Sequence, residues 1–118
     1  MWTRKLIGAR YFYAGHEARD GHFENGDLAT PRDVEGHGSH TLSTSSGNFV
    51  KHASLYGYVE GVAKGGAPHA RVVAYKVCWS EGCAATDILA AFEVGIDEGV
   101  CYLLIPYCNS RFILLLEK

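Results

Sequence analysis

The sequence predicts an α/β fold with three layers, in which helices flank a parallel sheet. The prediction rests on residues 71–105, where two apolar runs are joined by a helical segment. The first run, residues 71–78, is nearly continuous, which is typical of a strand buried on both faces. The second run covers residues 100–105. A strand, a helix and a strand with short joins form a βαβ unit, whose two strands run parallel.

The elements upstream of this unit follow from local signals. Residues 6–12 are apolar and aromatic enough for a short strand. Residues 13–35 are rich in Gly, Asp, Glu and His, and we expect a long surface loop there that leads to His37. Residues 37–46 are expected to form a helix that stops at a Gly-Asn pair. Residues 53–66 carry several glycines among small residues, which indicates a turn or hairpin.

The helix of the βαβ unit is expected to begin near Thr86, because a hydroxyl suits the N-cap position. Asp87 would then lie in the first turn, where the helix dipole favours a carboxylate. Gly99 fits the position just after the last turn. Four residues fall on one helical stripe, the pattern of a helix that faces a core: Ala85, Leu89, Phe92 and Ile96.

Length and charge exclude several classes of protein. At 118 residues, the chain is one small domain or a piece of a larger one. The formal net charge of −2 gives no reason to expect binding to nucleic acid or to an anionic membrane surface. No apolar run approaches the roughly 20 residues of a membrane helix, and the first residues lack the apolar stretch of a signal peptide.

The chain has four cysteines, at positions 78, 83, 101 and 108, and their spacing is not that of paired zinc knuckles. Cys78 and Cys83 flank a turn-like loop that a disulfide could close. A disulfide would require an oxidising compartment. From spacing alone, two reduced thiols are an equally good interpretation.

The most informative segment is Gly36-His37-Gly38-Ser39-His40-Thr41-Leu42-Ser43-Thr44. His37 lies between two glycines, where the backbone can turn sharply and approach other groups closely. Small and hydroxyl residues follow, which suits a tightly packed helix. A catalytic imidazole has to be held in one orientation, and a helix start can hold it so that it faces a cleft. The segment thus offers what a fixed catalytic imidazole would need, whereas a lone histidine in a glycine-rich turn is more often structural.

Two other interpretations of this region are weaker. His37 and His40, at i and i+3, could be two metal ligands on one helix face, but no third ligand has a matching spacing. The remaining histidines are scattered along predicted loops, so we expect no metal site. Residues 61–66 resemble a phosphate loop only in their glycines, because no Gly-Lys-Ser/Thr follows.

The histidine segment resembles, nearly letter for letter, the histidine motif of subtilisin-like serine proteases, and the chain is similar to their plant branch over residues 5–100. Several further blocks occur in the family's order: Lys5-Leu6-Ile7-Gly8-Ala9-Arg10-Tyr11-Phe12, Thr30-Pro31-Arg32-Asp33, Ala63-Lys64-Gly65-Gly66-Ala67-Pro68, Ala70-Arg71-Val72-Val73-Ala74-Tyr75-Lys76-Val77-Cys78-Trp79 and Asp87-Ile88-Leu89-Ala90-Ala91-Phe92. We accordingly predict a partial subtilisin-like catalytic domain at residues 5–105 and a divergent tail at residues 106–118.

The resemblance implies peptide-bond hydrolysis through an acyl-enzyme, with a polypeptide substrate and no organic cofactor. It makes His37 the triad base, and it raises the expectation that Cys78 pairs with Cys83, because the family pairs cysteines at such positions. It also implies a secreted or cell-wall protein. In the subtilisin triad, Asp, His and Ser follow one another in that order along the chain.

The chain departs from the family pattern at the other two triad positions. The family's aspartate lies on an upstream strand in an Asp-Ser/Thr-Gly context, and neither Asp20 nor Asp27 has an apolar strand before it. The Gly-Thr-Ser-Met context of the nucleophile does not occur. We therefore expect no appreciable hydrolysis by the 118-residue polypeptide, since losing triad members costs orders of magnitude in rate. The alternative is a non-catalytic product that binds peptides or another protease.

Overall fold

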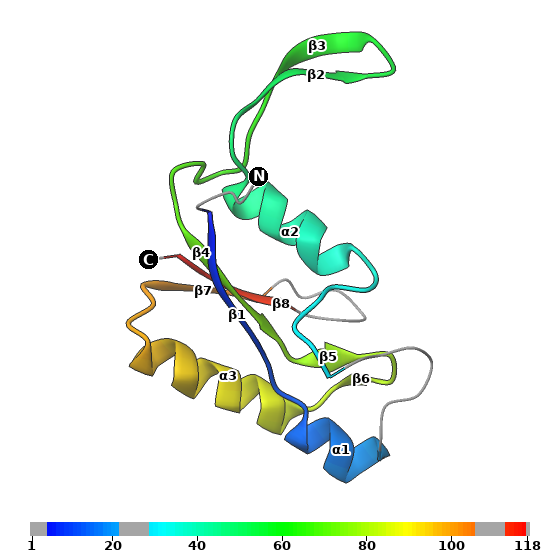
Figure 1. Cartoon of the computed structure of the whole chain (residues 1–118), viewed down its shortest axis with the longest axis vertical. Helices are drawn as coiled ribbons and strands as arrows, with labels where there is room; N and C mark the ends of the chain where they lie inside the picture. Colours follow the sequence, from blue (N-terminus) through cyan, green and yellow to red (C-terminus); the bar gives the residue numbers. More distant parts are fainter. Residues whose placement is uncertain (1–4, 22–28, 106–112, 118) are drawn as a thin grey trace.

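The structure is a computed structural model that describes residues 5–21, 29–105 and 113–117, the last of these as backbone only. Its centre is a four-stranded sheet with the order β1-β4-β8-β7 (Figure 1). The strands are β1 (Leu6–Tyr11), β4 (Val72–Lys76), β7 (Tyr102–Leu104) and β8 (Ile113–Glu117). β1 and β4 pair in parallel, whereas β8 pairs antiparallel with both β4 and β7.

Helices cover both faces of this sheet, and β4 shows how. Along a strand, alternate side chains point to opposite faces. Tyr75 and Val77 lie in one buried cluster with Ala91 of α3 (Ala85–Asp97), while Ala74 packs on the other face against Leu42 of α2 (His37–Ser46). α2 and α3 are therefore on opposite sides of the sheet (Figure 1). The predicted α/β class, with a parallel strand pair and flanking helices, is confirmed.

The βαβ unit differs from the simple form that the sequence predicts. β4, α3 and β7 follow one another as expected, and β7 runs in the same direction as β4. The two strands do not pair with each other, because β8 lies between them and bonds to both. A segment of the predicted tail thus provides an inner strand of the sheet.

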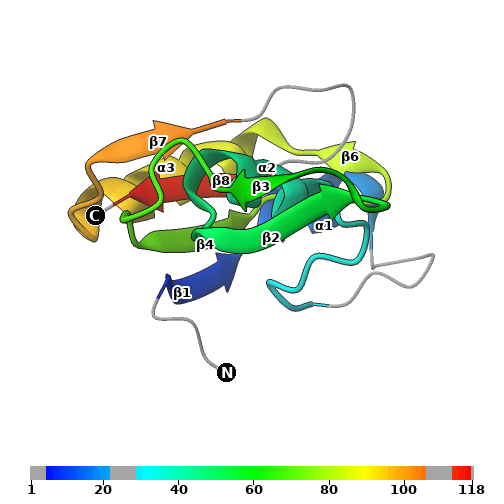
Figure 2. The same cartoon turned by 90° about the horizontal axis from the view of Figure 1, so that it is seen from above.

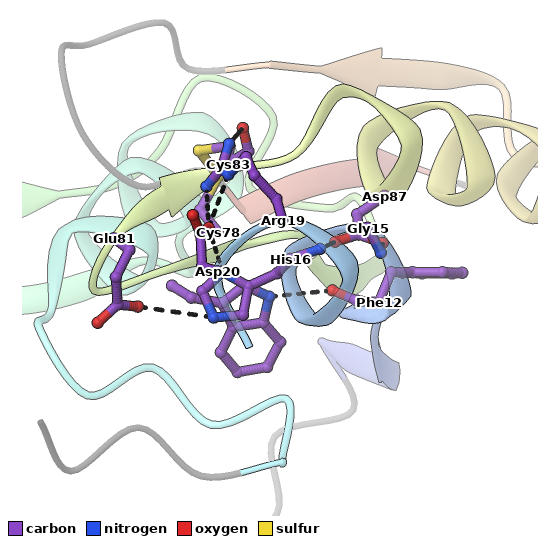
Figure 3. A network of polar contacts seen from close by, with 10 residues as sticks. Phe12, Gly15, His16, Arg19, Asp20, Cys78, Glu81, Cys83 and Asp87 are labelled. Carbon is purple, nitrogen blue, oxygen red and sulfur yellow. Dashed lines mark hydrogen bonds and ion pairs between the residues drawn. A yellow bond between two sulfur atoms is a disulfide. The ribbon is translucent and has the colours of Figure 1, made fainter. Parts of the chain in front are cut away.

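A helix is present where the sequence analysis expected only a loop. α1 (Ala14–Asp20) follows β1 directly and packs against α3. Its second and third amides are bound by a residue far along the chain: Gly15 N–H and His16 N–H donate to the two carboxylate oxygens of Asp87, at 2.8 and 2.9 Å (Figure 3). A Cβ on Gly15 would lie 1.9 Å from the Thr86 hydroxyl oxygen, so this close approach of α1 to α3 requires glycine.

Two predictions for α3, the position of its N-cap and the stripe that faces the core, are wrong. Its N-cap is Ala84 and not Thr86. Asp87 lies in the first turn, as predicted, and its carboxylate accepts hydrogen bonds from α1. Within the expected stripe Phe92 packs against the core, but Ala85 is exposed, and Leu89 and Ile96 are 62% and 66% exposed. The buried positions of α3 are Asp87, Ala91 and Gly95. The helix is rotated so that its smallest side chains and its acid lie against the rest of the molecule.

The predicted turn region forms a hairpin of β2 (Val50–Leu55) and β3 (Tyr58–Ala63). It projects from the C-terminal end of α2, away from the central sheet (Figure 1). In the view from above, β2 and β3 lie in front of the rest of the molecule (Figure 2). Most of its side chains are exposed, including apolar ones such as Tyr56 and Val59. None of the helices in the described part of the chain is long and apolar enough to cross a lipid bilayer.

Candidate active site

The predicted helix of the histidine motif is present with the predicted bounds, and His37 is its first residue. Gly36 precedes it in the left-handed region, with φ of +92°, where glycine is favoured. The Gly36 carbonyl accepts the first helical hydrogen bond, from His40 N–H at 2.9 Å. His37 is partly exposed. The backbone therefore turns sharply into the helix and presents the imidazole at its start, as the motif predicts.

Asp33, which the sequence analysis noted only as part of a neighbouring block, binds the start of α2. Its Oδ1 accepts hydrogen bonds from the backbone N–H groups of Glu35 and Gly36, at 3.1 and 2.9 Å. Its Oδ2 accepts from both the N–H and the hydroxyl of Ser39, each at 2.7 Å. An aspartate whose side chain binds backbone a few residues onward is a known turn signal, so the sequence held a cue for this role.

These contacts set the ionisation of Asp33. Partial burial by itself raises the pKa of a carboxyl group. The hydrogen bonds from Ser39 and Gly36, together with the charge of Lys76, outweigh that effect and lower the pKa of Asp33 below its ordinary value. The group is thus held as a carboxylate that accepts four hydrogen bonds beside His37.

The C-terminal end of α2 is fixed by a different segment. Backbone N–H groups of Gly65, Gly66 and Ala67 donate to the carbonyls of Gly47, Thr44 and Ser45, at 2.9, 3.0 and 2.7 Å. A Cβ on Gly65 would lie 2.3 Å from the Gly47 nitrogen, which shows how closely the two backbones approach. Both ends of α2 are therefore held by groups outside it.

The hydroxyls of the motif serve the helix. Ser43 and Thr44 donate to the carbonyl of His40, and Ser45 donates to that of Leu42, at 2.7 to 3.0 Å. His40 is exposed, and it borders a surface pocket of about 480 Å³ between α2 and the base of the hairpin. Across the described residues, no three His, Cys, Asp or Glu side chains converge as metal ligands would.

The aspartates weighed as triad partners lie elsewhere or outside the described residues. Asp20 ends α1, where it accepts a hydrogen bond from Arg19 at 2.7 Å and lies 3.2 Å from Nδ1 of His16 (Figure 3). The hydrogen bond from Arg19 lowers the pKa of Asp20. His16 was expected in a loop but lies in α1. Its side chain is 1% exposed and packs against Trp79. Asp27 falls outside the described residues.

Cys78 and Cys83 form a disulfide that closes the short hairpin of β5 (Cys78–Trp79) and β6 (Gly82–Cys83). The hairpin leads directly into α3, and Arg19 of α1 donates to the Cys83 carbonyl at 3.1 Å (Figure 3). The indole N–H of Trp79 donates to the Phe12 carbonyl at 3.1 Å. Cys101 is an exposed free thiol.

Comparison with known proteins identifies the family. The model of the subtilase family matches residues 2–100. The chain is 53% identical over 99 residues to subtilisin-like protease SBT1.5 and 54% identical over 101 residues to subtilisin-like protease SBT5.3, both of Arabidopsis thaliana. It is 52% identical over 115 residues to a subtilisin-like protease of Glycine max.

These matches cover 83%, 82% and 94% of the chain, but only 13%, 13% and 14% of the respective relatives. The chain therefore corresponds to a part of a subtilisin-like protease domain. The family match contains the histidine motif, α2, β4 and α3, and it ends two residues before β7. From the extent of the family match and the identity to these relatives, we conclude that the chain belongs to the subtilase family.

Proposed function

We propose that the chain contributes the general base, His37, to a serine endopeptidase that hydrolyses peptide bonds. The observation that supports this most is the start of α2, where the motif predicted to hold a catalytic imidazole folds with His37 as the first helical residue. A base at this position has a fixed backbone and a partly exposed ring. Those are the properties that proton transfer to and from a bound substrate requires.

In the proposed reaction, a serine attacks the carbonyl of the scissile peptide and forms an acyl-enzyme. His37 takes the proton from the serine hydroxyl and then gives it to the leaving amine. An aspartate holds the imidazole in the correct tautomer and stabilises the imidazolium that forms. This chain's own contribution is the position of the ring. The serine and the aspartate would come from segments that correspond to other parts of the family domain.

The substrate proposed is a polypeptide, as the family implies, and the proposed location is extracellular or in the cell wall. The Cys78–Cys83 disulfide supports that location, because disulfides persist in oxidising compartments. For the 118-residue polypeptide alone we propose no appreciable hydrolysis. The non-catalytic alternative, a product that binds peptides or another protease, rests on the missing sequence contexts of the aspartate and the nucleophile.

The test begins with the transcript, read across both ends of this reading frame. A product with an upstream Asp-Ser/Thr-Gly strand and a downstream Gly-Thr-Ser-Met segment should react with a fluorophosphonate probe and cleave peptides. The substitution His37→Ala should abolish hydrolysis, whereas His52→Ala, on the exposed hairpin, should not. Undiminished hydrolysis by the His37→Ala protein would overturn the proposed role. Probe labelling of the 118-residue polypeptide would refute the expectation that it has no activated nucleophile.

A further inference from the structure

The Asp33 carboxylate binds donors on both sides of His37 along the chain. Glu35 and Gly36 donate from before it, and Ser39 donates twice from after it. The segment that carries the imidazole is therefore tied at two points to a single side chain. Because one carboxylate makes all four hydrogen bonds, the conformation of residues 35–39 depends on Asp33.

The start of α2 lacks the usual means of satisfying its amides. A helix leaves its first N–H groups without partners inside the helix, and a side chain at the N-cap normally binds one of them. The N-cap here is Gly36, which has no side chain, and the first turn holds no acidic residue. Asp33 supplies both the acceptor and the negative charge that favours a helix start.

Asp33 is in turn linked to the sheet. Lys76 of β4 is only 5% exposed, and its ammonium donates to the carbonyl of Arg32, next to Asp33, at 3.3 Å. The same ammonium lies 4.2 Å from the centre of the Trp79 ring. The charge of Lys76 is among the causes that keep Asp33 ionised. A path of contacts thus runs from the buried strand through residues 32 and 33 to the first turn of α2.

We propose that Asp33 is a positioning residue for His37, which fixes the first turn of α2 so that the imidazole keeps one direction. The importance of Asp33 for catalysis rests on the proposed role of His37 as general base. The contribution of Asp33 to the order of the first turn does not depend on that role. The remainder of α2 has its own support from residues 65–67, so the effect should be confined to residues 35–39.

The experiment uses the isotope-labelled 118-residue chain in solution. In Asp33→Ala, amide exchange at residues 36–39 should become about tenfold faster, the size of effect expected for the loss of a helix cap. The relaxation order parameter of the His37 ring should fall, while that of His40 should not. Amides of β4 should keep their protection. This confinement separates positioning from a general loss of stability, which would affect β4 as well.

Ser39 provides a milder variant and a rescue. Ser39→Ala removes one of the four hydrogen bonds and should accelerate exchange at residues 36–39 less than Asp33→Ala does. Ser39→Thr keeps the hydroxyl and should restore the wild-type exchange and ring order. Ser43→Ala is the matched control, because the Ser43 hydroxyl in the same helix binds the His40 carbonyl instead of Asp33.

Two results would overturn the inference. One is unchanged exchange and unchanged His37 ring order in Asp33→Ala. The other is a loss of protection spread over the whole chain in both Asp33→Ala and Ser39→Ala, which would make Asp33 a general support of the fold. If Asp33 orders the ring but His37→Ala leaves proteolysis intact in the longer product, the proposed function fails while the structural link between the two residues stands.

Discussion

The starts of α1 and α2 are both bound by an aspartate, but the two aspartates come from very different places in the chain. For α2 the acceptor is Asp33, two to six residues from the groups it binds. For α1 it is Asp87, 71 and 72 residues away on α3. The first arrangement is local and can form with the helix itself. The second exists only once α1 and α3 have packed together. The start of α1 is therefore a product of the tertiary fold.

The difference in burial predicts which arrangement matters more for stability. Asp87 is 2% exposed and serves a buried amide of His16, whereas Asp33 and its donors are close to solvent. A buried donor that loses its partner cannot turn to water, and its full desolvation cost then appears. The contact of Asp87 with α1 should therefore contribute more to the free energy of unfolding than the contact of Asp33 with α2, although each uses one carboxylate.

The largest effect should come from Asp87→Ala. The two N–H groups at the start of α1 lose a charged acceptor, and we expect the free energy of unfolding to fall by about 3 kcal/mol. Urea denaturation followed by circular dichroism measures this change. Asp97→Ala, at an exposed position of the same helix, is the control. Equal effects of the two substitutions would contradict the proposed importance of the contact between α1 and α3.

Loss of the Cys78–Cys83 disulfide should lower the free energy of unfolding by the next largest amount. Like Asp87→Ala, it should act where α1 packs against α3. The bond joins cysteines that are five residues apart in the sequence, and closing so short a loop stabilises the fold by about 2 kcal/mol on the chain-entropy model. In the double variant Cys78→Ser/Cys83→Ser, amide exchange should accelerate at Gly15 and His16 more than at Gly36 and Ser39. The reason is that the hairpin leads directly into α3. Equal acceleration at both helix starts would remove this distinction.

Asp33→Ala should be milder for the stability of the whole chain. We expect the free energy of unfolding to fall by about 1 kcal/mol, the typical value of a helix cap. Thermal and urea unfolding of Asp33→Ala and Asp87→Ala side by side provide the direct comparison. If Asp33→Ala is the more destabilising of the two, the ranking of local and long-range caps given above is wrong.

The smallest effect should be seen with pH. The pKa of Asp33 is lower in the folded state than its ordinary value, so its charge stabilises the fold at pH above about 4. That contribution is lost as the pH falls through the lowered pKa and the carboxylate is protonated. The difference in unfolding free energy between the wild type and Asp33→Asn should therefore shrink in acid. A difference that stays constant from pH 7 to strongly acidic conditions would contradict the lowered pKa.

The two helix starts also explain which parts of the structure could be predicted. The bounds of α2 were predicted correctly because a glycine turn and a Gly-Asn stop are local signals. α1 was missed, since residues 14–20 carry no capping side chain of their own and depend on Asp87. The predicted stripe of α3 was wrong because a sequence pattern cannot say that an acid and two small residues, rather than Leu89 and Ile96, face the molecule.

For the candidate site, the position of His37 at a helix start followed from the motif alone. The role of Asp33 was missed, although its spacing to Gly36 and Ser39 is short enough to have indicated an aspartate bound to the following turn. The link from Lys76 to residue 32 could not be predicted, because it joins segments 44 residues apart. Sequence therefore pointed to His37 as the candidate base, and the structure adds the residues that hold the backbone around it.

The inner position of β8 has a consequence for the order of folding. β8 is the last strand along the chain, yet it lies between β4 and β7 and bonds to both. Its register with β4 pairs Val72 with Glu117, so this contact closes a loop that contains α3 and β7. Long loops close slowly compared with helix formation. The sheet should therefore be completed late, after α3 has formed, and insertion of β8 is a natural candidate for the rate-limiting step.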